Sequence, residues 1–104
     1  MQNISVSQSF DKRKQNSGIP LIDVRTPAEY GSIHADGAVN HPMESLEMEK
    51  IPFAKEEEIH LICQSGGRSM KVSQKLEAAG FTNIVNIEGG TSAWHAAGLP
   101  VVEG

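Results

Sequence analysis

Short apolar runs alternate along this chain with polar and amphipathic stretches. The runs at 21–24, 59–62 and 84–87 contain mostly branched apolar residues, which is typical of strands buried inside a sheet. Two weaker runs, at 4–7 and 38–40, predict further strands. The pattern therefore predicts strands that are separated by helices.

The stretches between these runs carry helix signals. Residues 68–79 predict the longest helix, because apolar side chains recur there on one face at spacings of four and three. Thr26, Pro27 and Glu29 form a helix start, with a capping residue, a proline at the first position and a glutamate three residues after the cap. That helix is predicted to continue through 33. Other short helices are predicted at 9–16 and 91–97, with a helix or turn at 44–50.

Strands that alternate with helices predict an α/β fold in which helices cover both faces of a parallel sheet. In sheets of this kind, ligands bind at the carboxyl ends of the strands. These ends are occupied here by Arg25, His41, Cys63 and residues 88–89. The single cysteine is therefore predicted to lie where this architecture carries its chemistry.

Composition narrows the range of functions. A chain of 104 residues fits one compact domain over 1–104. The net charge of −4 argues against a nucleic-acid-binding protein, since such proteins usually present a basic face. No apolar run reaches the roughly 20 residues that a membrane helix needs. The first ten residues lack the apolar stretch of a signal peptide, so the cytoplasm is the expected location.

Cys63 is the only cysteine, and this limits its chemistry. It has no partner for an internal disulfide, and it cannot form a cysteine-based zinc site alone. The histidines and carboxylates show no metal-binding spacing, so no metal or cofactor is predicted. If Cys63 reacts with a thiol, that thiol belongs to another molecule.

The residues that follow Cys63 predict a site for an anion. Gly66 and Gly67 can adopt backbone conformations that turn successive N–H groups inward as an anion nest. The helix that begins there adds the positive end of its dipole, and Arg68 adds a full positive charge. A thiol in such surroundings is expected to have a lowered pKa.

Four parts of the chain resemble segments of rhodanese-like domains, and they follow one another in the same order as in that family. The loop at 63–69 is similar to the family's Cys-x-x-Gly-x-Arg pattern. The other parts, which extend the resemblance over about 21–101, are 21–25 with 29–30, then 34–40, then 79–83 with 88–90 and Trp94.

The resemblance implies a five-stranded parallel sheet between helices and a sulfurtransferase activity. Family members pass sulfane sulfur from a donor, such as thiosulfate or a persulfide, to a thiophilic acceptor, such as cyanide or a thiol; either partner can be a protein. By this resemblance Cys63 is the nucleophile that carries the persulfide, and Arg68 stabilises the anionic donor and the loop. The implied persulfide cradle consists of Gln64, Ser65, Gly66, Gly67, Arg68 and Ser69.

Two features of the loop bear on the substrate. Many family members carry a basic residue directly after the cysteine, whereas here that position is Gln64, which favours a persulfide donor over doubly charged thiosulfate. Phosphatases and arsenate reductases of the same fold use a loop one residue longer than the four residues between Cys63 and Arg68. The alternatives to a turnover sulfurtransferase are a sulfur-carrier module and, less favoured, a phosphatase or arsenate reductase.

Four further residues are candidates for the pocket or its structural support. Asp23 and Arg25 close an apolar strand and are expected to form a buried ion pair. His41 lies at a strand end that faces the site. Trp94 either lines the pocket or packs in the core. His60 is not one of these candidates and is expected to be a hydrogen-bonded strand residue.

Overall fold

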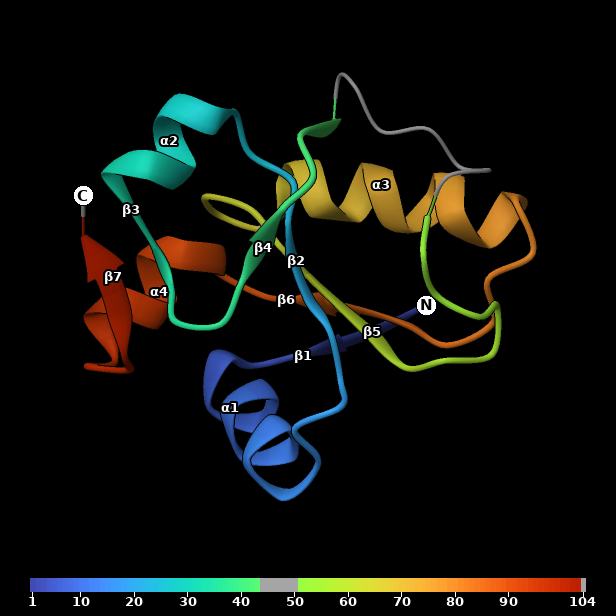
Figure 1. Cartoon of the computed structure of the whole chain (residues 1–104), viewed down its shortest axis with the longest axis horizontal. Coiled ribbons are helices and arrows are strands. Elements are labelled where there is room, and N and C mark those ends of the chain that lie inside the picture. Colours follow the sequence, from blue (N-terminus) through green and yellow to red (C-terminus); the bar gives the residue numbers. More distant parts are fainter. Residues whose placement is uncertain (44–50, 104) are drawn as a thin grey trace.

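A computed structural model describes residues 1–43 and 51–103, and its centre is a sheet of five parallel strands (Figure 1). The strand order is β1-β6-β5-β2-β4, so β5 lies in the middle of the sheet. The predicted α/β fold is therefore confirmed, while the helix or turn predicted at 44–50 lies outside the described residues. The strands are β1 (Gln2–Ile4), β2 (Leu21–Asp23), β4 (Val39–Asn40), β5 (Ile59–Ile62) and β6 (Ile84–Ile87).

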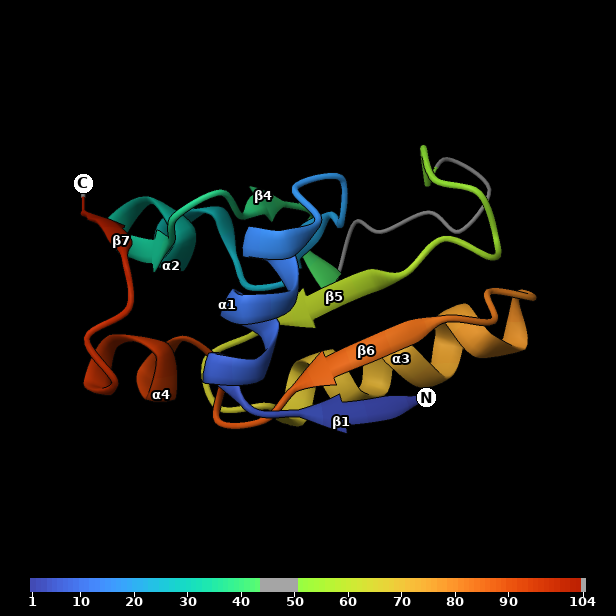
Figure 2. The ribbon, with the colours of Figure 1, turned by 90° about the horizontal axis from the view of Figure 1, so that it is seen from below.

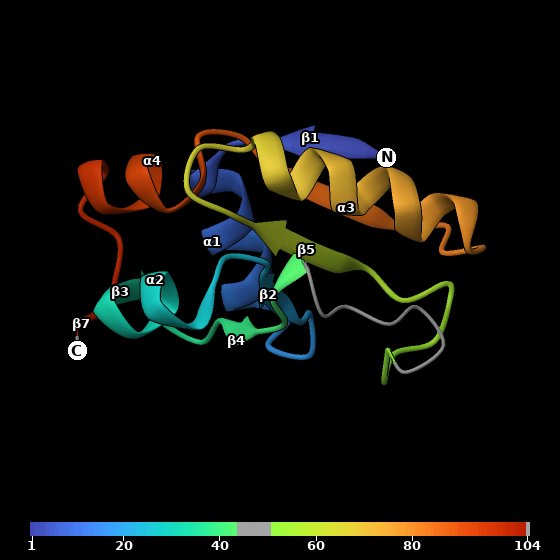
Figure 3. The same cartoon turned by 90° about the horizontal axis from the view of Figure 1, so that it is seen from above.

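Helices lie on both faces of this sheet. Figures 2 and 3 view the molecule from opposite sides and show α1 in front of the sheet in one view and α3 in the other. Among the described residues, no helix is long and apolar enough to cross a membrane. The helices are α1 (Val6–Gln15), α2 (Pro27–Ser32), α3 (Gly67–Ala78) and α4 (Gly90–Ala96).

Two clusters of buried apolar side chains fill the space between the sheet and its helices. Val72 and Leu76 of α3 belong to the cluster on one face, together with Cys63. Val6 of α1 and Trp94 of α4 belong to the cluster on the other face. Every residue of β2, β5 and β6 is buried, as their apolar runs predict.

The N-terminal elements differ from the prediction. The strand predicted at 4–7 is wrong after Ile4, because Ser5 begins α1 as its capping residue. The Ser5 hydroxyl accepts a hydrogen bond from the Gln8 amide at 3.1 Å, and the Gln8 side chain accepts one from the Ser5 amide at 2.8 Å. This capping box fixes the helix start at Val6 instead of Ser9.

A small second sheet is absent from the prediction. β3 (Ile33–Ala35) pairs antiparallel with β7 (Val101–Glu103). The helix predicted to run through Ile33 therefore ends one residue earlier, at Ser32. Strands of three residues are too short for their apolar alternation to stand out, and their pairing joins segments far apart in the sequence.

Candidate active site

Cys63 directly follows β5, at the carboxyl edge of the sheet, and its side chain is buried with 1% exposed. The chain then turns at Gly66, whose φ of +106° is a conformation that favours glycine. This turn brings the Gly66 N–H to within 3.0 Å of Cys63 Sγ, to which it donates a hydrogen bond. The Ser69 hydroxyl donates to the same sulfur at 3.3 Å.

These donors shift the pKa of the thiol. Burial raises the pKa of Cys63, but hydrogen bonds from the Ser69 hydroxyl and amide, together with those from the Gly66 and Ser65 amides, outweigh it. The net effect is a Cys63 pKa below the ordinary value. The lowered pKa expected from the sequence is thus present, and the donors that lower it come from the backbone and a hydroxyl.

The positive charge of Arg68 has a partner of its own, which the sequence argument did not foresee. Its Nη1 and Nη2 donate to the two carboxylate oxygens of Glu29 at 2.6 and 2.7 Å, so α3 is tied to α2. The hydrogen bonds from Arg68 lower the pKa of Glu29 to about 2, even though partial burial opposes the shift. Thr26, which caps α2, contributes to the same lowering.

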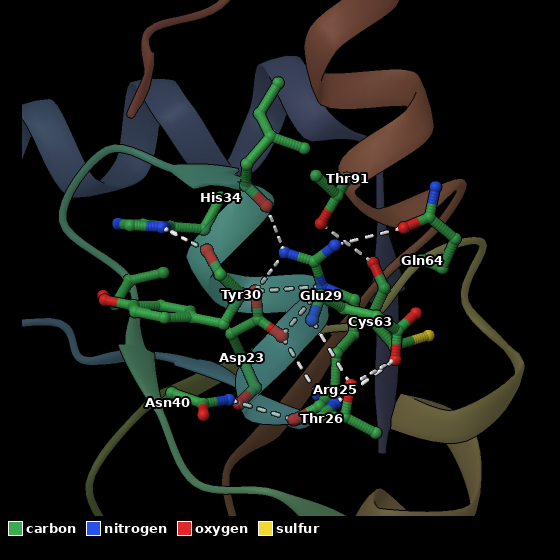
Figure 4. A network of polar contacts seen from close by, with 12 residues as sticks. Asp23, Arg25, Thr26, Glu29, Tyr30, His34, Asn40, Cys63, Gln64 and Thr91 are labelled. Carbon is green, nitrogen blue, oxygen red and sulfur yellow. Dashed lines mark hydrogen bonds and ion pairs between the residues drawn. The ribbon is translucent and has the colours of Figure 1, made fainter. Parts of the chain in front are cut away.

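Asp23 and Arg25 form the buried ion pair that their positions at the end of β2 suggested (Figure 4). Arg25 Nη2 donates to Asp23 Oδ2 at 2.8 Å and to the Ile33 carbonyl at 2.5 Å. Its Nη1 donates to Gln64 Oε1 at 3.1 Å. The pair therefore joins β2 to β3 and to the first residue after the cysteine.

Gln64 is held from a second side by α4. Its side-chain Nε2 donates to Ser92 Oγ at 2.8 Å, and its backbone carbonyl accepts from the Ser92 backbone amide at 3.1 Å. The Cys63 carbonyl accepts from both the amide and the hydroxyl of Thr91, at 2.7 and 3.1 Å. Gly90 lies so close that an added Cβ would stand 2.3 Å from the Cys63 carbonyl oxygen. The loop is thus fixed against the start of α4.

Asn86 is a site residue that the sequence argument missed. It lies on β6, buried, and its Oδ1 accepts a hydrogen bond from the Ser69 hydroxyl. Its Nδ2 donates to Asn3 Oδ1 at 3.0 Å, so a polar chain runs from Cys63 through Ser69 towards the surface at Asn3. The sequence contains a signal for this role, because Asn86 is the one polar residue in an otherwise apolar strand.

Two open cavities flank the loop. One, of about 440 Å³, lies between the segment that follows β2, the helix α2 with the start of β3, and the loop. The other, of about 270 Å³, lies at the ends of β1 and β6 beside the start of α3. The first is lined by Arg25, Ala28, Glu29, Ser32, Ile33 and Gln64, and the second by Asn3, Ser65, Gly66, Met70, Asn86, Glu88 and Gly89.

Trp94 and His41 are the remaining candidates, and each donates a hydrogen bond to a backbone carbonyl. Trp94 is fully buried, donates from Nε1 to the Pro100 carbonyl at 2.7 Å and meets the Phe10 ring edge-on at 6.0 Å between centroids. His41 is partly buried, and its amide donates to the Asp23 carbonyl at 2.9 Å. Within 1–43 and 51–103, no group of three or more histidine, cysteine, aspartate or glutamate side chains is arranged to hold a metal ion.

Comparison with known families and solved structures finds rhodanese-like domains. The family model of the rhodanese-like domain matches residues 6–97. The crystal structure of a rhodanese-like domain protein from Staphylococcus aureus superposes with a TM-score of 0.81 at 33% identity. That match covers 90% of this chain and 91% of the other.

Curated relatives carry related names. A protein of Arabidopsis thaliana named thiosulfate sulfurtransferase 16, chloroplastic, is 41% identical over 96 residues, with 81% of this chain and 80% of that protein covered. A protein of Allochromatium vinosum named sulfurtransferase is 31% identical, with 98% of this chain and 96% of that protein covered. Some relatives are longer, since the chain spans only 57% of an uncharacterized Synechocystis protein to which it is 34% identical.

Proposed function

The chain belongs to the family of rhodanese-like domains, and on that premise we propose that it transfers sulfane sulfur through a persulfide on Cys63. The observation that carries the proposal is the set of donors around Cys63 Sγ. The Gly66 amide and the Ser69 hydroxyl lie at 3.0 and 3.3 Å from the sulfur, and they lower the pKa of the thiol against the effect of burial. A thiolate is the form of cysteine that attacks sulfur.

The first half-reaction loads the enzyme. The Cys63 thiolate attacks the sulfane sulfur of the donor, a sulfur–sulfur bond forms at Cys63, and the bond between the donor's two sulfur atoms breaks. The leaving group departs as sulfite from thiosulfate or as a thiolate from a persulfide. We expect the donors that stabilise the thiolate to stabilise the persulfide anion as well, because both are sulfur anions at the end of the same side chain.

The second half-reaction removes the transferred sulfur from Cys63. A nucleophile, cyanide or a thiolate, attacks the outer sulfur of the Cys63 persulfide, and the Cys63 thiolate is the leaving group. Cys63 is the only cysteine in the chain, so no internal thiol can resolve the persulfide as a disulfide. The acceptor is therefore another molecule, either small or a protein.

The size of the loop supports sulfur over phosphate chemistry. Four residues separate Cys63 from Arg68, and the Gly66 amide is already at hydrogen-bond distance from Sγ. The guanidinium of Arg68 pairs with both oxygens of Glu29, whereas phosphate binding calls for a guanidinium that pairs with phosphate oxygens. We therefore expect no Cys63-dependent hydrolysis of para-nitrophenyl phosphate.

Thiocyanate formation tests the proposal. The protein is incubated with cyanide and either thiosulfate or cysteine persulfide, and Cys63→Ser is the matched control. Multiple turnovers that require Cys63 would support an enzyme. One equivalent of thiocyanate per Cys63, with no further turnover, would support the sulfur-carrier alternative. No Cys63-dependent thiocyanate from either donor would contradict sulfur transfer.

A further inference from the structure

Each arginine beside the Cys63 loop is paired with a carboxylate. Arg25 is 1% exposed and lies against Asp23, with 2.8 Å between Nη2 and Oδ2. Arg68 holds both carboxylate oxygens of Glu29. Because the charges of each pair sum to zero, neither pair adds net positive charge beside the loop.

The loop itself adds no charge to this balance. Residues 64–67 are a glutamine, a serine and two glycines. The side chain of Gln64 occupies the position after the cysteine, fixed between Arg25 and Ser92. Glu88, which lines the smaller cavity, contributes a further negative charge. The ionised groups named at the loop and its two cavities thus sum to −1: two arginines against three carboxylates.

What binds the reacting sulfur is a small set of uncharged donors. The Gly66 amide and the Ser69 hydroxyl contact Sγ directly, and both come from the loop and the first turn of α3. Such donors suit a single negative charge placed on one sulfur atom. They offer no cation for the three oxygens and second charge of a sulfonate group, which in proteins are usually met by arginine or lysine.

We propose that this pairing of cations makes the site selective for persulfide donors, which bring one negative charge at the reacting group, over doubly charged donors such as thiosulfate. The inference rests on the sulfur transfer proposed above and names its donor class. In the loading step, the Cys63 thiolate attacks the outer sulfur of the anion R–S–S⁻, the donor's S–S bond breaks and R–S⁻ leaves. The transferred sulfur becomes the terminal S⁻ of the Cys63 persulfide, the leaving thiolate takes a proton from solvent, and no oxidant or reductant is consumed.

Glu29→Gln tests the proposal, because it removes the charge that neutralises Arg68. Glutamine also completes a capping box with Thr26, so the start of α2 is kept. The second-order rate of Cys63 loading is measured by mass for thiosulfate and for cysteine persulfide. An electrostatic gain scales with donor charge, so we expect thiosulfate loading to rise about tenfold and persulfide loading only about threefold.

A second variant keeps the test independent of α2. Gln64→Arg adds a cation to the loop, while Gln64→Met removes the same hydrogen bonds to Arg25 and Ser92 without adding charge. We expect thiosulfate loading to rise in the first variant and not in the second. Glu56→Gln is the control for net charge, since Glu56 precedes β5 at the end opposite to Cys63 and is exposed.

The outcomes separate this proposal from the one on which it rests. If neither donor loads Cys63, sulfur transfer itself is wrong. If both donors load it, but thiosulfate does so at least as fast as cysteine persulfide in the wild type, the selectivity is wrong. Equal gains for the two donors in Glu29→Gln would also overturn it, because a change that ignores donor charge is not electrostatic.

Discussion

The sulfur of Cys63 receives its donors from residues three and six positions further along the chain. The Gly66 amide and the Ser69 hydroxyl reach it because the loop turns through a glycine with positive φ and then enters α3. The Ser69 hydroxyl lies within reach of three acceptors, which are Cys63 Sγ, the Gly66 carbonyl and Asn86 Oδ1. It can therefore donate to the sulfur when the thiolate forms, and this makes Ser69 the side chain that tunes the pKa of Cys63.

Replacing Ser69 with alanine should raise the pKa of Cys63, because one donor to the thiolate is lost while burial remains. Alkylation of Cys63 by iodoacetamide, followed as a function of pH, measures this. We expect alkylation at pH 7 to be slower by about threefold to tenfold. Ser73→Ala is the matched control, since the Ser73 hydroxyl donates to the Ser69 carbonyl and not to the sulfur. A pH profile that is unchanged in Ser69→Ala would contradict the assignment.

At the scale of elements, the sequence predicts best those strands that are buried throughout. β5 and β6 have the bounds that the apolar runs at 59–62 and 84–87 predict, because a strand covered on both faces excludes most polar residues. β3 and β7 escape prediction since their three-residue pairing depends on tertiary contact. The polar residues inside these apolar runs join elements, because Asn86 and His60 form hydrogen bonds to neighbouring helices.

His60 connects α1 to β5 in the core. Its Nδ1 lies 2.6 Å from the Ser9 hydroxyl, and its Nε2 lies 2.7 Å from a carboxylate oxygen of Glu58, which also pairs with Lys12 at 2.9 Å. Burial, together with the positive charges of Lys12 and Arg13, lowers the pKa of His60 more than Glu58 raises it. The folded protein therefore holds the ring neutral to lower pH than the unfolded chain does. The prediction that His60 is a hydrogen-bonded strand residue is confirmed.

This network predicts a pH dependence of stability. An unfolded histidine has a pKa of about 6.5, so below that pH the unfolded chain binds more protons than the folded one. The free energy of unfolding should therefore fall as pH falls from 7 to 5.5. Urea denaturation across this range measures it, and His60→Gln should flatten the dependence. His95→Gln, at an exposed position, should leave it intact. An equal slope in wild type and His60→Gln would refute the role of this ring.

At the scale of the whole molecule, the site is where distant parts of the chain meet. The loop after β5 is bonded to α4 through Thr91 and Ser92, and to α2 through Arg68 and Glu29. The sequence places Cys63 at the carboxyl edge of the sheet, because parallel topology follows from alternating strands and helices. The sequence does not reveal that Arg68 pairs with Glu29, because this ion pair depends on how α2 and α3 pack against each other.

Gly90, the first residue of α4, packs closely against the loop. An added Cβ there would lie 2.3 Å from the Cys63 carbonyl oxygen and 2.7 Å from the Gln64 carbonyl carbon, and the φ of +58° adds strain. We expect Gly90→Ala to lower the free energy of unfolding by about 3 kcal/mol and to reduce sulfur loading of Cys63. Chemical denaturation and loading by mass are the measurements.

Gly31→Ala provides the comparison. Gly31 lies within α2, and a Cβ there would meet nothing within 4 Å. Alanine should raise the free energy of unfolding by about 0.5–1 kcal/mol, because it is the better helix former. If Gly90→Ala were as stable as the wild type, the close packing of α4 on the loop would not be a requirement of the fold.

The mass of the Cys63-containing peptide tests the central claim most directly. Protein treated with cysteine persulfide, freed of excess donor and digested without reductant should show this peptide heavier by one sulfur, about 32 Da, and cyanide should return it to its original mass. Cys63→Ser should show no gain under the same treatment while remaining folded. A Cys63 peptide that gains no sulfur from cysteine persulfide or thiosulfate, or a gain that persists after cyanide, would contradict the account.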